Sequence, residues 1–263
     1  MLVLSSPAKY PLVLSIHGGG FHKGDKTDNA AYYTSLASSG FVVAAINYRI
    51  GWTQDSVNLC DGDSLEAAEA VYRALQDARA SLRFMTAHAD DYKIDTNWMF
   101  ISGSSAGALT ALYTAYADQK DMDTYFPGIS DILGPIDADN ALKNTYSLKA
   151  VVSMWGALAS PYIISAADAK PTIFFQGLGD SVVPCGIGNY YNCPNLGTGY
   201  GSIPLYQRLQ SLNVPAIAHI DPAGDHGVYT EDYRTPNIVC FLNDVMAGDV
   251  KSMYDTKQSS NCN

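Results

Sequence analysis

The sequence lacks several features that would place it in other classes of protein. No uninterrupted apolar run reaches the roughly 18 residues that a membrane-spanning helix needs, although 47% of the residues are hydrophobic. Only 16% of the residues are charged, and the net charge of −10 disfavours a nucleic-acid-binding surface. A chain of 263 residues with this apolar content can bury a full core, and we expect one α/β domain over residues 1–263.

Cysteine is scarce as well. The five cysteines include no C-x-x-C pair of the kind found in zinc and redox sites, so we expect no bound metal. Cys185 and Cys193 share an irregular loop that a local disulfide would stiffen, and we expect them to pair. A second bridge, from Cys240 to Cys262, would attach the C-terminal tail to the last helix. Cys60 would then be the unpaired cysteine, either buried or lacking a partner lost by truncation. Disulfides would indicate an oxidising compartment; the alternative is five reduced cysteines in a cytoplasmic enzyme.

One short stretch carries the main functional signal. Residues 99–110 join an apolar, β-type run to a small-residue helical run through Gly-x-Ser-x-Gly, the pattern of a nucleophile elbow. Gly103 and Gly107 lack Cβ atoms where strand and helix pass close together, so Ser105 can occupy a strained turn with its side chain projecting. The Ala106 N–H, at the positive end of the helix dipole, would then lie beside an oxyanion formed there. The alternative is a Gly/Ser-rich loop without a catalytic role.

A glycine run follows the first predicted buried strand, residues 10–16. His17 precedes Gly18, Gly19 and Gly20, which would let backbone N–H groups turn toward a site at the carboxyl edge of a parallel sheet. We interpret the run as an oxyanion hole; a flexible strand-to-loop turn is the alternative. We expect His17 to support this loop structurally, because a base at this point would precede the nucleophile in the chain.

The remaining pattern alternates strands and helices. Further buried strands are expected at residues 41–47, 150–155, 171–176 and 216–220. One long helix is predicted to be capped by Asp63 and Glu66; a calcium site at Asp61 and Asp63, in the loop before it, is the less favoured alternative. The helix is expected to bury the face that carries Leu65, Ala68, Tyr72, Leu75, Leu82 and Met85. A final amphipathic helix over residues 238–246 precedes a polar tail with no structural signal.

Two side chains at strand ends could complete a catalytic group with Ser105. Asp180 falls just past the carboxyl end of a predicted strand, between a glycine and a Val-Pro pair. His226 lies on a glycine-flanked loop after the last strand, whereas His219 lies within that strand and should be held by packing. Asp225 adjoins the proposed base, and neighbours on an extended loop usually point apart. The resulting chain order, Ser, Asp, His, matches the α/β-hydrolase arrangement.

Residues 118–147 lose helical and strand periodicity and carry several acids, glycines and prolines. An insertion after the elbow helix would lie above the carboxyl edge of the sheet. It is either a small lid or cleft wall, where such scaffolds acquire function, or an ordinary surface excursion; both readings stay open.

Several motifs together resemble a carboxylesterase of the α/β-hydrolase superfamily, in the group with a His-Gly-Gly-Gly loop that includes hormone-sensitive-lipase-type esterases, bacterial carboxylesterases and feruloyl esterases. The motifs are His17-Gly18-Gly19-Gly20-Phe21, Asn47-Tyr48-Arg49, Gly103-Ser104-Ser105-Ala106-Gly107, Gly179-Asp180-Ser181-Val182-Val183-Pro184 and Gly224-Asp225-His226-Gly227. The resemblance implies an α/β-hydrolase fold with a mostly parallel central sheet and helices on both faces.

The resemblance also implies how such a site works. Ser105 would be the nucleophile, Asp180 and His226 its partners, and the N–H groups of Gly19, Gly20 and Ala106 the oxyanion hole. The expected reaction is hydrolysis of short-chain or aryl- or sugar-linked carboxylic esters, with small-molecule or polysaccharide-linked substrates and no cofactor. A peptidase with the same triad and a non-catalytic binding module of the same fold are the alternatives.

Two departures from the family pattern stand out. The family usually has one or two antiparallel strands before the strand at residues 10–16, and almost nothing precedes it here. This suggests truncated N-terminal strands and an open sheet edge that could serve as a dimer contact. The large N-terminal helical cap of some relatives is also missing, so we expect an open cleft. A secreted or periplasmic location is favoured, and a cytoplasmic one is the alternative.

Overall fold

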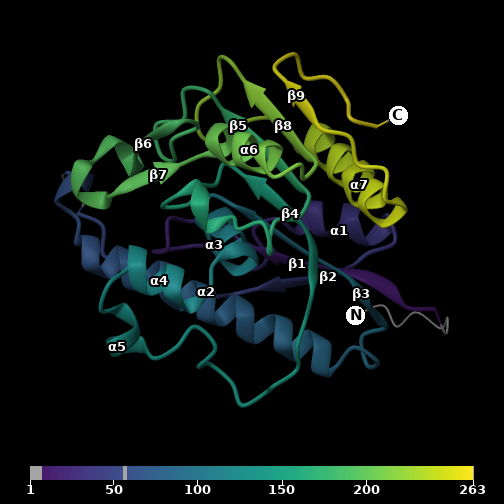
Figure 1. Ribbon diagram of the computed structural model, residues 1–263, viewed down its shortest axis with the longest axis horizontal. Coiled ribbons are helices and arrows are strands. Elements are labelled where there is room, and N and C mark those ends of the chain that lie inside the picture. Colours follow the sequence, from purple (N-terminus) through teal and green to yellow (C-terminus); the bar gives the residue numbers. More distant parts are fainter. Residues whose placement is uncertain (1–7, 56–57, 263) are drawn as a thin grey trace.

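The computed structural model describes residues 8–55 and 58–262, and its centre is a seven-stranded sheet (Figure 1). Every pair of neighbouring strands in this sheet is parallel. In spatial order the strands are β2 (Val42–Ile46), β1 (Tyr10–Ile16), β3 (Ile94–Ser104), β4 (Leu148–Met154), β5 (Thr172–Gly177), β8 (Ala216–Asp221) and β9 (Met253–Asp255). The expected mostly parallel sheet is confirmed.

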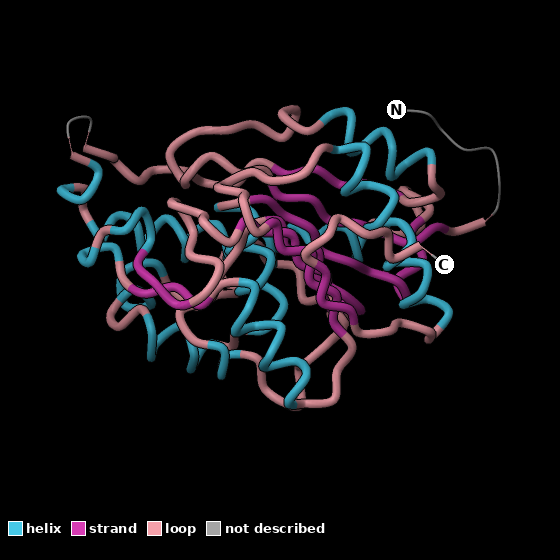
Figure 2. Tube along the Cα trace, turned by 90° about the horizontal axis from the view of Figure 1, so that it is seen from above, coloured by secondary structure: helices cyan, strands magenta, loops and turns pink. Residues whose placement is uncertain are grey.

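Helices cover both faces of the sheet (Figure 2). The alternation of side chains along β1 divides the core: Leu12 and Leu14 belong to one apolar cluster and Val13 to the other. The first cluster is completed by α2 (Ser64–Ala87), α3 (Ala106–Tyr116) and α6 (Ser202–Ser211), the second by α1 (Ala30–Ser38) and α7 (Glu231–Ala247). The strands are therefore buried on both sides, which explains their near-continuous apolar sequences.

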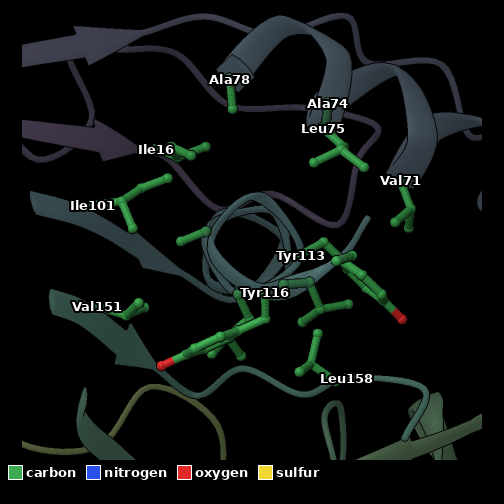
Figure 3. Packing of buried hydrophobic residues seen from close by; sticks show 14 of the residues in the cluster. Ile16, Val71, Ala74, Leu75, Ala78, Ile101, Tyr113, Tyr116, Val151 and Leu158 are labelled. Atoms are coloured by element: carbon green, nitrogen blue, oxygen red, sulfur yellow. The ribbon is translucent and has the colours of Figure 1, made fainter. Parts of the chain in front are cut away.

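Helix α3 lies at the centre of the larger cluster (Figure 3). It packs on the sheet residues Ile16, Ile101 and Val151 and, on its other side, on Val71 and Leu75 of α2 (Figure 3). Nearly all of its residues are buried, as expected for a helix that is apolar all round. The start of α3, where the elbow lies, is thereby held between two packed layers.

The beginning of α2 confirms Asp63 as the cap, whereas the Glu66 carboxylate accepts from the Thr53 N–H at 3.0 Å instead of completing the cap. The Asp63 carboxylate accepts hydrogen bonds from the N–H groups of Leu65 (2.8 Å) and Glu66 (3.1 Å). Tyr72 and Leu75 are fully buried as expected, but Leu65 is 52% exposed. Leu65 lies one residue into the helix, beyond the part of α2 that the core covers, so the helical spacing alone overstates the buried face.

The C-terminal region differs from the expectation in two ways. Helix α7 begins seven residues earlier than expected, at Glu231, and contains Pro236. The tail carries no structural signal in the sequence, but it supplies β9, which pairs with β8 at Ile217, Ala218 and His219. A three-residue strand is too short to show a periodic pattern, so only its tertiary pairing identifies it.

The insertion contains two short helices, α4 (Gln119–Tyr125) and α5 (Ile129–Leu133). It packs along α2, where the Gln76 side chain donates to the carbonyls of Leu133 (2.9 Å) and Pro135 (3.0 Å). Asp137 forms ion pairs with Arg79 (2.9 Å) and Arg83 (2.6 Å) of the same helix. The insertion is thus attached to the helical layer along much of its length.

One of the two disulfide predictions is wrong. Cys193 pairs with Cys60, 133 residues away, and Cys185 is a buried free thiol. Proximity along the chain favours a partner within the same loop, whereas folding brings that loop against the turn at Leu59–Asp61. The second predicted bridge, Cys240–Cys262, is confirmed and joins α7 to the tail.

Strand β2 forms one edge of the sheet, and within the described residues it pairs only with β1. The open edge that the resemblance implies would lie at β2 and stays a prediction. Between β5 and α6 along the chain, β6 (Ile187–Asn189) and β7 (Thr198–Tyr200) form a separate antiparallel hairpin.

Candidate active site

Ser105 occupies the turn between β3 and α3 with a backbone that few residues adopt. Its φ of 54° and ψ of −122° are unfavourable for a residue with a Cβ and need support from the surrounding structure. That support comes from hydrogen bonds: the Ser105 N–H donates to the Met154 carbonyl at 2.9 Å, and the Ser105 carbonyl accepts from Ala108 (2.8 Å) and Leu109 (3.0 Å). The side chain is thereby presented at the carboxyl edge of the sheet.

The two glycines of the elbow are sterically required. A Cβ on Gly103 would lie 2.1 Å from the Gly107 carbonyl oxygen, and one on Gly107 would lie 2.1 Å from the Ile16 carbonyl oxygen. Both distances are far below a van der Waals contact. The pattern that identified the elbow in the sequence therefore reflects real contacts between β3, α3 and β1.

The structure brings together the three side chains that the sequence analysis selected. His226, on the loop after β8, has Nε2 2.9 Å from Ser105 Oγ and Nδ1 3.0 Å from both carboxylate oxygens of Asp180, which follows β5. The Asp180 side chain is fully buried, and that of His226 is 23% exposed. Because a carboxylate only accepts hydrogen bonds, Nδ1 carries a proton and Nε2 is free to accept the Ser105 hydroxyl.

The competing acid and base lie elsewhere. Asp225 accepts hydrogen bonds from the N–H (2.7 Å) and hydroxyl (2.9 Å) of Ser181, and these bonds lower the pKa of Asp225. It therefore braces the loop that carries Asp180. His219 is completely buried within β8, as predicted, and has its own hydrogen-bond partners there.

The glycine loop packs directly against the elbow. A Cβ on Gly18 would lie 3.3 Å from Ser105 Cβ, and one on Gly19, whose φ is +107°, would lie 2.1 Å from the Lys23 carbonyl oxygen. Gly20 and Ala106 line the cavity beside Ser105. Across residues 8–55 and 58–262, neither Gly19 nor Gly20 donates its N–H to a backbone acceptor.

His17 supports the glycine loop from beneath. It is buried, its Nδ1 contacts the Gly18 carbonyl at 2.7 Å, and its ring stacks on Tyr48 with centroids 4.4 Å apart. The Tyr48 hydroxyl donates toward the carbonyls of His17 (3.1 Å) and Gly18 (3.2 Å). These contacts agree with the structural role expected for His17, and they explain why the Asn-Tyr-Arg segment accompanies the glycine run.

A cavity of about 350 Å³ opens beside Ser105. Its wall is mainly apolar and aromatic, and its aromatic members are Phe21, Trp52, Tyr113, Tyr125, Phe126, Tyr190 and Tyr191. Burial raises the pKa of Tyr113, Tyr190 and Tyr191, so these phenols remain neutral. Apart from Phe21 in the glycine-run motif, these side chains carry no signal in the sequence, because they come from five separate segments and share no local pattern.

Two segments that are irregular in the sequence, the insertion at residues 118–147 and the loop that carries Cys193, contribute to the cavity wall. Tyr125 and Phe126 of the insertion form part of the wall, whereas Asp137 and the residues around it contact α2 instead. The wall also contains Tyr190 and Tyr191, which are close in sequence to Cys193 of the Cys60–Cys193 bridge. That bridge joins this loop to the segment that carries Trp52.

Other kinds of site are not seen in the described chain. Within residues 8–55 and 58–262, no three His, Cys, Asp or Glu side chains are grouped so as to hold a metal ion. None of the helices in that part of the protein is both long and apolar enough to cross a membrane.

A family model described as BD-FAE matches residues 3–190. The chain belongs to the BD-FAE family. The matched range contains Ser105 and Asp180 and ends before His226. Among solved structures, the chain resembles a truncated form of a carbohydrate esterase from gut microbiota, with a TM-score of 0.63 and 17% identity over 92% of this chain and 88% of that one. The expected α/β-hydrolase fold is thereby confirmed.

The curated relatives of this BD-FAE chain are much longer proteins, and the similarity covers only part of each. Esterase cest-33 of Caenorhabditis elegans is 30% identical over 126 residues, which are 46% of this chain and 21% of that protein. The neuroligin-like protein glit-1 of the same organism is 33% identical over 99 residues, 38% of this chain and 12% of that protein. The similar segment is therefore a small part of each relative.

Proposed function

We propose that the protein is a serine carboxylesterase in which Ser105, His226 and Asp180 form the catalytic triad. The observation that carries the proposal is the unbroken sequence of contacts from Asp180 through His226 to Ser105, at 3.0 and 2.9 Å, beside an apolar cavity. Membership in an esterase family supports the same reaction class.

In the acylation step, His226 Nε2 removes the hydroxyl proton as Ser105 Oγ attacks the ester carbonyl carbon. The Asp180 carboxylate holds the imidazole in the required tautomer and stabilises its positive charge. The imidazolium then donates its proton to the leaving alcohol, and the acyl group remains on Ser105. In the second half, His226 activates a water molecule in the same way, and Ser105 is regenerated. No step of this sequence uses a cofactor.

We propose that the N–H groups of Gly19, Gly20 and Ala106 stabilise the oxyanion of each tetrahedral intermediate. Gly18 packs against Ser105, so the loop lies within reach of the attacked carbonyl, and Ala106 begins α3 at the positive end of its dipole. Loss of one such donor in a comparable site costs on the order of 10²–10³ in rate.

The substrates we propose are short-chain, aryl-linked or sugar-linked carboxylic esters. The cavity of about 350 Å³ is near the lower end of the range for small-ligand sites, roughly 300–1,000 Å³. Its apolar wall suits an acyl chain or an aromatic ring, and neutral tyrosine hydroxyls at the wall could bond to a sugar hydroxyl. The two disulfides support a secreted or periplasmic location, since such bridges persist in oxidising compartments. The β2 edge is the proposed dimer contact.

The deciding experiment is covalent labelling with a fluorophosphonate, followed by peptide mapping and a panel of esters. We expect the probe on Ser105, turnover of p-nitrophenyl acetate and butyrate, and neither in Ser105→Ala. A folded protein whose Ser105 stays unmodified would overturn the proposal in favour of a binding module. Ester and amide analogues of one acyl group separate an esterase from a peptidase.

A further inference from the structure

A buried amide touches the proposed triad and has no part in the steps above. Gln176 lies near the end of β5, four residues before Asp180, and is fully buried. Its Nε2 lies 3.3 Å from Asp180 Oδ2 and 2.8 Å from the Val183 carbonyl oxygen. Its Oε1 accepts from the N–H (3.0 Å) and the hydroxyl (2.6 Å) of Ser202, the first residue of α6.

The orientation of this amide follows from its partners. The Val183 carbonyl can only accept a hydrogen bond, and the Ser202 N–H can only donate one, so the nitrogen must face Asp180 and Val183 and the oxygen must face Ser202. Both donors and both acceptor positions of the Gln176 side chain are then used. An amide that is fully bonded in this way is held in one orientation.

Only one of the two oxygens of the Asp180 carboxylate, Oδ2, accepts a hydrogen bond from this donor. Its Oδ1 accepts from the N–H groups of Val182 and Val183, each at 2.9 Å. Its Oδ2 has, apart from His226 Nδ1, only the Gln176 amide as a partner in the described part of the chain. Because this carboxylate is excluded from water, a lost donor could not be replaced by solvent without a rearrangement.

We propose that Gln176 is a positioning residue for the reaction, which fixes the plane of the Asp180 carboxylate so that both oxygens face His226 Nδ1. The inference rests on the proposed esterase function. Gln176 does not line the cavity, so it acts through Asp180 and not on the substrate. Its other bonds join the same carboxylate to the start of α6 and to Val183 in the cavity wall.

Gln176→Glu is the informative substitution because the two side chains have nearly the same shape. The glutamate can still accept from Ser202, but its second oxygen faces Asp180, and two carboxyl groups this close share one proton. While the pair holds that proton, the glutamic acid can donate in place of the amide. As the pH rises and the proton leaves, the two carboxylates repel each other and the alignment with His226 is lost.

We therefore expect Gln176→Glu to show a new fall of kcat on the alkaline side, absent from the wild type, with KM unchanged within about twofold. Loss of one hydrogen bond to a charged group corresponds to a roughly 10- to 100-fold decrease in kcat. In an Asp180→Asn background, the same substitution should cause little further loss, because the group through which it acts is already altered. Thermal unfolding checks that each variant is folded.

Ser202→Ala is the matched control, since it removes a bond at the opposite end of the same amide and leaves Asp180 untouched. It should lower thermal stability without changing the pH profile. A folded Gln176→Glu with wild-type kcat and pH profile would overturn the inference, and so would an equal pH shift in Ser202→Ala. Fluorophosphonate labelling of the wild type separates the two proposals: without labelling of Ser105 both fail, whereas normal labelling with an unchanged Gln176→Glu overturns this one alone.

Discussion

Among the histidine–carboxylate pairs of the described residues, His226–Asp180 and His219–Asp255 differ in what lies on the far side of the ring. His226 Nδ1 lies 3.0 Å from Asp180, and His219 Nδ1 lies 3.4 Å from Asp255. The His226 ring presents Nε2 to the Ser105 hydroxyl at 2.9 Å. The His226 side chain is 23% exposed, whereas that of His219 is completely enclosed.

In the second pair, both ring nitrogens of His219 contact side chains from the C-terminal region. His219 Nε2 contacts the Asn261 side chain at 3.1 Å, and Nδ1 also contacts the Tyr233 hydroxyl at 2.8 Å. The ring stacks on Phe175 with centroids 4.9 Å apart. A histidine beside a carboxylate is thus not sufficient for base catalysis; the ring also needs a reactive partner on Nε2 and access for a substrate.

The largest expected difference between the pairs is in catalytic rate. His226→Ala should lower kcat/KM by on the order of 10⁴-fold or more, because Ser105 loses its base. His219→Gln, which keeps polar groups in the same place, should lower it by less than about tenfold. Steady-state kinetics on p-nitrophenyl acetate, with circular dichroism to verify folding, provide the comparison. The reverse order of effects would make His219 the base.

Replacing the two carboxylates should separate the pairs again. Asp180→Asn should decrease kcat by roughly 10⁴-fold, the size of effect seen when the corresponding acid of a serine protease is changed in this way. The two oxygens of Asp255 accept from the Lys257 (3.1 Å) and Ser259 (2.8 Å) N–H groups. Asparagine keeps only one acceptor oxygen, so Asp255→Asn should lower stability and leave kcat nearly unchanged. Comparable losses of kcat in both variants would contradict the distinction.

The disulfides extend the comparison from side chains to whole segments. Replacing Cys240 and Cys262 by serine opens a loop with a sequence separation of 22 and should cost about 3 kcal/mol of unfolding free energy, with normal kinetics. Replacing Cys60 and Cys193 should also raise KM several-fold, because that bridge supports the cavity wall. Denaturant unfolding and KM measured on each double variant test this; a raised KM in the first variant would argue against it.

The smallest effect expected is a dependence of stability on pH. Burial lowers the pKa of His219 below its ordinary value of 6.5, so below that value the unfolded chain binds more protons than the folded one. The stability contributed by neutral His219 is complete above about pH 6.5 and decreases as the pH falls toward the lowered pKa. His219→Gln should flatten Tm between pH 6.5 and 5. Parallel Tm curves for wild type and variant would refute this.

The sequence predicted the parts of the fold that depend on neighbouring residues. The apolar runs of β1 and β3, the Asp63 cap and the glycines of the elbow each follow from backbone preferences and contacts within a few residues. The selection of Ser105, Asp180 and His226 used a further local property, their place just after a buried strand. In a parallel sheet all such positions lie at one edge, and for this reason a one-dimensional pattern could anticipate which side chains meet.

Other features were decided by tertiary structure alone. Cys60 and Cys193 are 133 residues apart, and no local pattern distinguishes Cys193 from Cys185 as the bonded partner. The aromatic wall of the cavity and the pairing of β9 likewise depend on segments that meet only after the sheet has formed. Sequence by itself determined the order of the longer strands and helices and the reactive residue types at the strand ends, because these arise from short-range stereochemistry. The disulfide partner, the cavity wall and the enclosure of His219 depend on long-range packing, and only the folded chain defines them.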